Sequence, residues 1–161
     1  MVFMLAACSP DYNWRQVSLA DNTVTAFFPD RTVTQSRTLV FDGHELEFSL
    51  TSAVVGEASF TVAHAALPEA LRNDATRRQA FGQAVLQSLY RNLGVEPPGS
   101  LPEPGQTFLI EGQAPDRGLR LKARFWLSEQ ALTEALVTAS PRDFPDNQAD
   151  EFLRGVSAVA R

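Results

Sequence analysis

The sequence is poor in the residues that form disulfides and metal sites. It has one cysteine and two histidines in 161 residues, and a single cysteine excludes an internal disulfide. So few ligands give no basis for a metal site, and we expect neither a metal nor a cofactor. An excess of positive charge is also missing, because fourteen Lys and Arg stand against nineteen Asp and Glu. A general nucleic-acid binder needs a basic face, so we expect no nucleic-acid partner.

Recognised catalytic motifs are missing too. The serines lie in no Gly-x-Ser-x-Gly elbow, and the sequence contains no glycine-rich phosphate loop of a recognised spacing. We therefore expect a protein that is not an enzyme. What is present is an ordinary globular composition, with 44% hydrophobic and 20% charged residues. A chain of this length builds one domain with a hydrophobic core and is too short for two.

The first eight residues carry the most specific pattern in the sequence. Met1 to Ala7 are uncharged and apolar, and this stretch is far shorter than the ~20 residues that span a bilayer. An apolar stretch that ends in small residues is typical of the end of a secretory signal peptide. Leu5-Ala6-Ala7-Cys8 resembles the bacterial lipobox, whose cysteine is lipidated and becomes the first residue of the mature protein.

The lipobox resemblance implies a membrane-anchored protein. It implies three acyl chains on Cys8, and Ser9 in place of aspartate favours transfer to the outer membrane in the usual Gram-negative sorting pattern. No Lys or Arg precedes Cys8, whereas an export signal normally begins with positive charge, so we expect that basic region to lie upstream. The alternative interpretation is a frayed apolar terminus with a chance cysteine. We expect a signal-peptide remnant over 1–7, a lipidated tether over 8–14 and a single domain over 15–161.

The remaining sequence alternates between strand and helix patterns. Asp42-Gly43 separates two β-branched and aromatic runs, which is the strongest short signal for a hairpin. Apolar residues at helical spacing follow Pro68, and Gly94 is placed to end that helix. Strands are expected over 24–28, 37–41, 44–51, 59–65, 107–111, 119–127 and 131–138, helices over 73–93 and 146–159, and a surface loop over 95–105.

This order of elements predicts an α+β domain, with a mostly antiparallel β-sheet and two packed helices. The order of elements, the Phe27-Phe28-Pro29 opening and the Asp42-Gly43 hairpin resemble the PsbP-like fold, an αβα sandwich, over residues 24–160. The stretch from Cys8 to Arg15 also resembles the start of a group of uncharacterised Gram-negative lipoproteins. Both resemblances imply a fold and a compartment, and neither brings catalytic residues.

One strand carries a candidate contact surface. Arg120, Lys122 and Arg124 alternate along it, and Trp126 continues the same face. A basic stripe that ends in an aromatic would bind a phosphate, a lipid head group or an acidic partner. The alternative interpretation is a solvated face whose charges meet carboxylates on neighbouring strands, at Glu45, Glu47 or Glu134.

The histidines and the N-terminal aromatics have structural explanations. His44 and His64 fall in phase with the apolar residues of their strands and are expected as diagonal neighbours near strand ends. A metal site would need a third ligand, and Glu45 and Glu47 point to the opposite face, so we expect two structural histidines. Tyr12 and Trp14, in the last part of the tether, are expected to pack onto the domain as part of a first strand.

Two functions follow from these observations. The first is a non-enzymatic envelope lipoprotein, a monomer anchored in the outer membrane and facing the periplasm, that acts on an envelope protein partner as an interaction or assembly module. The alternative is a periplasmic ligand-binding lipoprotein that holds a small anionic or amphipathic molecule on its sheet face or in a crevice between helix and sheet.

Overall fold

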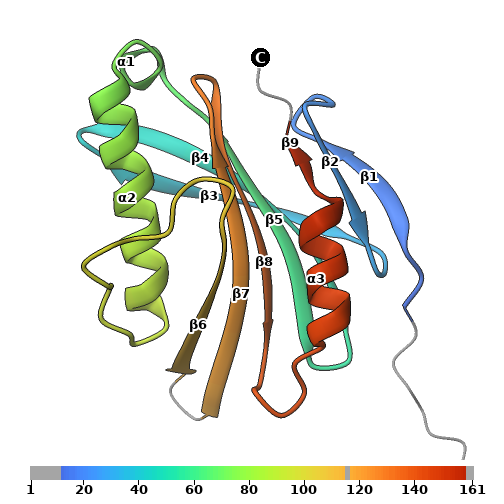
Figure 1. Ribbon diagram of the computed structural model, residues 1–161. Helices are drawn as coiled ribbons and strands as arrows, with labels where there is room; N and C mark the ends of the chain where they lie inside the picture. Colours follow the sequence, from blue (N-terminus) through green and yellow to red (C-terminus); the bar gives the residue numbers. More distant parts are fainter. Residues whose placement is uncertain (1–11, 115–116, 159–161) are drawn as a thin grey trace, which may run out of the picture.

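The computed structural model describes residues 12–114 and 117–158 (Figure 1). Three helices and nine strands make up this part of the chain. The helices are α1 (Glu69–Arg72), α2 (Ala75–Asn92) and α3 (Asp146–Gly155). The strands are β1 (Arg15–Leu19), β2 (Val24–Phe28), β3 (Val33–Phe41), β4 (His44–Val55), β5 (Ala58–Ala66), β6 (Thr107–Ala114), β7 (Arg117–Leu127), β8 (Ala131–Ala139) and β9 (Ser157–Ala158).

The strands form two antiparallel sheets, which confirms the predicted α+β class. The larger sheet has six strands in the order β3-β4-β5-β8-β7-β6, and the smaller has the order β1-β2-β9. The predicted hairpin at Asp42-Gly43 is confirmed, since Phe41 and His44 are paired residues of β3 and β4. Both turn residues have positive φ, 50° at Asp42 and 77° at Gly43, as a two-residue hairpin of this twist requires.

The six-stranded sheet is covered on both faces, at different places. Helix α2 lies on one face, while α3 and the smaller sheet lie on the other (Figure 1). Strand β4 serves both sides, because Leu46 and Phe48 pack beneath α2 and Ala53 and Val55 belong to the core under α3. Even-numbered residues near the start of β4 are therefore buried on one face, and odd-numbered residues near its end are buried on the other. A simple alternation of apolar and polar residues does not predict this change.

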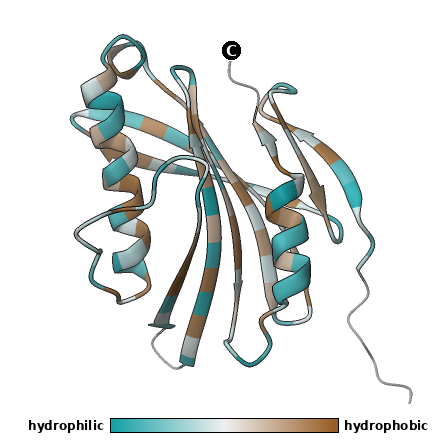
Figure 2. Cartoon of the chain, viewed as in Figure 1, coloured by the Kyte–Doolittle hydropathy of each residue, from teal (hydrophilic) through white to brown (hydrophobic). Residues whose placement is uncertain are grey.

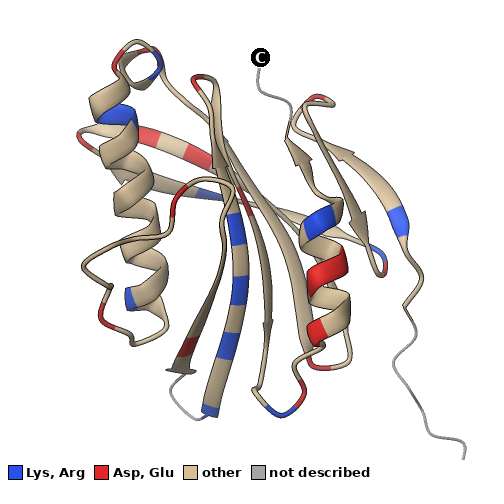
Figure 3. Cartoon of the chain, in the orientation of Figure 1, with Lys and Arg blue, Asp and Glu red and all other residues tan. Residues whose placement is uncertain are grey.

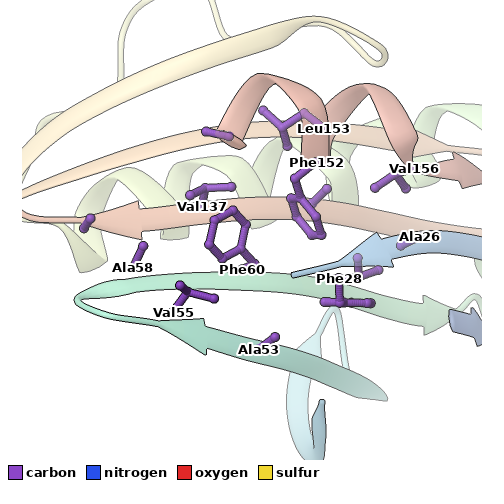
Figure 4. Close-up of a cluster of buried hydrophobic side chains, with 14 of the residues drawn as sticks. Ala26, Phe28, Ala53, Val55, Ala58, Phe60, Val137, Phe152, Leu153 and Val156 are labelled. Atoms are coloured by element: carbon purple, nitrogen blue, oxygen red, sulfur yellow. The ribbon is translucent and has the colours of Figure 1, made fainter. Parts of the chain in front are cut away.

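The core under α3 is built around phenylalanines (Figure 4). The rings of Phe28 and Phe60 each lie 5.4 Å from the ring of Phe152 on α3. Tyr12 and Trp14 pack edge-on against Phe60, with ring centroids 6.1 and 6.2 Å away. This confirms that both aromatics pack onto the domain, but they precede β1 and are not part of the first strand as predicted. Both also lie inside the stretch expected as a tether. Brown, hydrophobic bands recur along the strands and helices in Figure 2.

The predicted closing helix is too long. It ends at Gly155, and Ser157 and Ala158 form β9, which pairs with Thr25 and Val24 of β2. The extended backbone of Val156, with φ −79° and ψ 124°, starts this change while its side chain stays buried. The free edge of β2 provides backbone hydrogen-bond partners, and tertiary pairing therefore overrides the helical pattern. A short helix α1, which the sequence did not predict, precedes α2.

The predicted lipidation site, Cys8, lies outside the described residues. No helix within 12–114 and 117–158 combines the length and the apolarity needed to cross a membrane.

Candidate functional site

The basic residues of β7 share one face, but two of them are already paired. They alternate along β7, as the blue bands show (Figure 3), and the ion pair of Lys122 with Asp150 identifies their face as the one toward α3. The Nζ of Lys122 pairs with the carboxylate of Asp150 on α3. The guanidinium of Arg120 contacts Oε1 of Glu111 on β6, with Nη2 at 2.7 Å, and its Cζ lies 5.6 Å from the centre of the Phe144 ring.

The carboxylates expected to face these cations were predicted wrongly. Glu134 is paired with Phe125 on β7 and therefore lies on the same face as Phe125. Phe125 follows Arg124 in the strand, so this face is opposite to that of the basic residues. Glu45 and Glu47 lie on β4, which β5 and β8 separate from β7. The actual partners come from β6 and α3, and only the folded arrangement brings them near.

Arg124 holds a loop in place. Its Nε donates a hydrogen bond of 2.8 Å to the carbonyl oxygen of Gly105, and Gly105 N–H donates in turn to the carbonyl oxygen of Phe125 at 2.7 Å. The Cζ of Arg124 lies 5.0 Å from the centre of the Trp126 ring, in cation–π contact. The predicted loop over 95–105 is thereby fixed at its end to β7, so its last residues can form a wall.

That wall belongs to a cavity of about 530 Å³, which we call the Trp126 cleft. It opens at one end of the sheet, between the smaller sheet, the β7–β8 hairpin and the end of the 95–105 loop. Its floor comes from three adjacent strands, since His64 is opposite Thr133 and Thr133 is opposite Trp126. The lining residues are Ala20, Asp21, Thr23, Val24, His64, Ala66, Pro104, Gly105, Trp126, Leu127, Ser128, Gln130, Ala131, Thr133 and Ala158.

His64 is the polar centre of the cleft. Its Nδ1 lies 3.0 Å from the hydroxyl oxygen of Thr133, and Thr133 is only 3% exposed. Burial lowers the pKa of His64, and the negative charge of Asp21 opposes that shift more weakly. The imidazole is therefore neutral at pH 7 and serves as a hydrogen-bonding group. Because Thr133 is so deeply buried, its hydroxyl orients the ring and is not placed to attack a ligand.

An unusual turn places Asp21 at the cleft. Ala20, Asp21 and Asn22, between β1 and β2, have φ of 51°, 52° and 66°. The left-handed region costs a non-glycine residue roughly 1–2 kcal/mol, so three such residues in succession require local compensation. Thr23 provides some of it, because its hydroxyl donates to the carbonyl oxygen of Ala20 at 2.6 Å. A role for Asp21 was not predicted from the sequence, although Asp and Asn are the residues other than glycine that most readily adopt positive φ.

The prediction that the two histidines are neighbours is wrong. Ser49, not His44, is opposite His64. His44 is the first residue of β4, five residues before Ser49, which is roughly 17 Å at strand spacing. The two side chains also point to opposite faces of the sheet. Odd-numbered residues of β4 are opposite even-numbered residues of β5, so His64 shares a face with Ser49, whereas His44 lies on the other face. Within the described residues, no three His, Cys, Asp or Glu side chains come together as a metal site would require.

A second cavity, which we call the Glu134 groove, lies between α2 and the sheet on the face away from the Trp126 cleft. Its volume is about 500 Å³. Glu134 is 7% exposed, its Oε1 has no hydrogen-bond partner, and burial raises its pKa to about 7. From the sequence, Glu134 was expected only as a partner for the cations of β7. Its position as the single charge in the strand ALTEALVTA was the available signal for a special role.

Comparisons with known proteins leave the site to be interpreted from its geometry. No family model, curated protein or solved structure matches this chain.

Proposed function

We propose that the protein is a non-enzymatic, membrane-anchored lipoprotein that binds a small amphipathic molecule in the Trp126 cleft. The observation that carries the proposal is a preformed cavity of about 530 Å³, within the range of small-molecule sites. Its floor combines an indole, a neutral imidazole and a buried hydroxyl on three neighbouring strands. Such a site offers one apolar surface and a few converging polar groups.

The lining favours a ligand with an uncharged polar end. Trp126, Leu127 and Val24 provide an apolar wall, and His64, Ser128 and Gln130 provide hydrogen-bonding groups. Asp21 is the one charged residue of the described lining, which contains no Lys or Arg. An anion would therefore meet a negative charge in the lining, where no cationic side chain opposes it. Of the two ligand classes expected from the sequence, the amphipathic one fits this cleft.

The anchor and the finer fold identity are part of the same proposal. The lipobox-like Leu5-Ala6-Ala7-Cys8 supports lipidation of Cys8 and a place at the periplasmic face of the outer membrane. Helices on both faces of an antiparallel sheet (Figure 1) support assignment to the PsbP-like fold. Each methylene of an acyl chain that is buried in the membrane contributes ~0.8 kcal/mol of binding free energy. Three acyl chains would therefore keep the cleft close to lipid, which is a source of amphipathic molecules.

The cleft can be tested by tryptophan fluorescence. Trp14→Phe leaves Trp126 as the only indole, since the chain has two tryptophans. We expect 1-monooctanoylglycerol to shift the Trp126 emission with saturation, and octanoate of the same chain length to bind at least tenfold more weakly. Ala66→Phe, at an exposed position on the cleft wall, is expected to abolish the shift. Ser36→Phe, exposed on β3, is the matched control, and equal loss in both variants would contradict the proposal.

The anchor needs a separate experiment. Cys8→Ala is expected to move the protein from the membrane fraction to the soluble fraction, without changing the emission shift of Trp126. Equal membrane recovery of the wild type and the variant would contradict lipidation and leave the cleft proposal standing.

One observation favours a second function, an interaction module for an envelope protein. Strand β3 is an edge of the larger sheet, with six exposed residues in succession, including Val33 at 65% exposure. Long exposed edges pair readily with an extended segment of another chain. In-cell crosslinking followed by affinity purification tests this function, with Val33→Lys and Val40→Lys as variants. A crosslinked envelope protein that both variants retain would contradict binding at β3.

A further inference from the structure

Glu134 occupies a position where a charge is costly. Among the described residues it is the only charged side chain in the buried class, and it lies on β8, near the centre of the six-stranded sheet. Most buried carboxylates are paired or fully hydrogen-bonded. The carboxyl of Glu134 has one oxygen, Oε1, without any hydrogen-bond partner, so its environment is incomplete as it stands.

The groove around Glu134 has apolar walls. Phe48 and Leu50 of β4, Leu136 of β8, and Val85 and Leu89 of α2 form apolar walls. Hydroxyl groups line the floor beyond them, where Ser52 and Thr61 are hydrogen-bonded to each other at 2.7 Å. The cavity of about 500 Å³ thus joins an apolar surface to a single buried carboxyl.

No cation of the described lining reaches that carboxyl. Arg37 is the only other charged residue that lines the groove, and the lining residues from α2, β4, β5 and β8 are otherwise uncharged. Arg37 lies on β3, three strands from β8, which places their backbones roughly 14 Å apart. The described ion pairs include no contact between the two side chains.

We propose that the Glu134 groove binds an amphipathic organic ammonium ion, with the ammonium group at the Glu134 carboxylate and the apolar chain along α2. An N–H donor of an ammonium ion forms a charge-assisted hydrogen bond of about 2.7–2.9 Å with a carboxylate, and the low dielectric of the groove strengthens it. A neutral alcohol would leave the buried charge uncompensated, and an anion would add repulsion. The proposal rests on a different face from the Trp126 cleft and does not depend on it.

The test uses n-octylammonium chloride as the probe and the full chain as the protein. Isothermal titration at pH 8 is expected to show saturable binding at one site, and n-octanol and octanoate are expected to bind at least tenfold more weakly. Amide resonances of Ala63, Leu136 and Val85, which border the groove, are expected to shift in NMR spectra during the titration. Shifts confined to residues of the Trp126 cleft would overturn the proposal.

Matched variants separate the carboxylate from general effects. Glu134→Gln keeps the side-chain size and is expected to weaken octylammonium binding at least tenfold. Glu47→Gln, an exposed carboxylate on β4, is expected to change nothing. Equal affinity of wild type and Glu134→Gln would overturn the proposal.

A second pair of variants tests the groove if Glu134→Gln fails to fold. Ser88→Phe, which fills the groove from α2, is expected to abolish binding, whereas Gln83→Phe on the exposed side of the same helix is not. Retained binding in Ser88→Phe would overturn the proposed location.

The pH dependence gives an independent readout. Burial raises the pKa of Glu134 to about 7, while an alkylammonium, like lysine, stays charged to about pH 10. The free carboxyl therefore loses its proton between pH 6 and 8, and affinity for octylammonium is expected to rise roughly tenfold over that range. Arg37 is the other charged residue of the lining. A flat profile in the wild type would contradict a role for the Glu134 carboxylate.

Discussion

Gly112 on β6 lies directly against Leu93, the C-cap residue of α2. A Cβ atom at position 112 would stand 2.8 Å from the Cβ of Leu93 and closer still to its carbonyl oxygen. That carbonyl oxygen accepts a hydrogen bond of 3.1 Å from the N–H of Gln113. The end of the long helix therefore docks onto the edge strand of the sheet through backbone contact, which only glycine allows.

Gly112→Ala is expected to lower the free energy of unfolding by about 2 kcal/mol or more, because the backbone carbonyl of Leu93 must move. Urea denaturation followed by circular dichroism measures the change. Gly99→Ala is the control, since a Cβ there meets nothing within 4 Å, and its effect is expected to stay within about 0.5 kcal/mol. Equal stability of the two variants would show that the docking is loose.

Glu134→Gln is expected to remove a pH dependence of stability. Because the pKa of Glu134 rises from 4.5 to about 7, the folded state holds its proton more tightly than the unfolded chain. Stability therefore falls as pH rises from about 4.5 to about 7, by at most about 3 kcal/mol. Urea denaturation at pH 5 and pH 8 is expected to show this fall in the wild type and in Glu47→Gln. A wild-type slope equal to that of Glu134→Gln would contradict it.

His64 is expected to contribute with the opposite sign. Burial lowers its pKa below 6.5, so the unfolded chain binds the proton first as pH falls through 6.5. The wild type is therefore expected to lose stability on acidification below pH 6.5, relative to His64→Gln. Thermal melts at pH 7.5 and pH 5.5 measure the difference between the two proteins. His44→Gln, on the other face of the sheet, is expected to follow the wild type, and a His64→Gln profile like that of the wild type would be evidence against the shift.

Arg124→Ala is expected to free the end of the 95–105 loop. The change removes the hydrogen bond to the carbonyl oxygen of Gly105, and the backbone bond from Gly105 to Phe125 then stands alone. Hydrogen exchange at the Gly105 amide is expected to quicken, together with weaker binding in the Trp126 cleft. Arg120→Ala is the matched control on the same strand, and unchanged exchange in Arg124→Ala would show that the loop is held by other contacts.

The Lys122–Asp150 pair is expected to contribute little to stability. The side chain of Asp150 is 45% exposed, and such ion pairs are typically worth up to about 1 kcal/mol. A double-mutant cycle with Lys122→Ala and Asp150→Ala measures the coupling by urea denaturation. Neither change is expected to affect ligand binding in the Trp126 cleft. Loss of binding without loss of stability in Lys122→Ala would restore the basic stripe as a ligand site.

Local chemistry was sufficient to predict most of the elements. Asp42-Gly43 specified its hairpin because both residues tolerate positive φ, and the spacing of apolar residues specified α2. Strand patterns placed seven of the strands to within a few residues. The α+β class follows from that order of elements.

Register, facing and partnership required the tertiary structure. His44 and His64 are both even-numbered, yet they lie on opposite faces of the sheet. The two-residue turn between β4 and β5 pairs odd-numbered residues of β4 with even-numbered residues of β5, and the pattern within either strand does not reveal this register. Glu111 and Asp150, not the expected carboxylates, met the cations of β7 because β6 and α3 are brought beside it only by folding. The sequence by itself therefore determined the helices, strands and the Asp42-Gly43 hairpin, because these depend on local spacing and turn chemistry. The two cavities depended on the tertiary structure, because their walls come from segments distant along the chain.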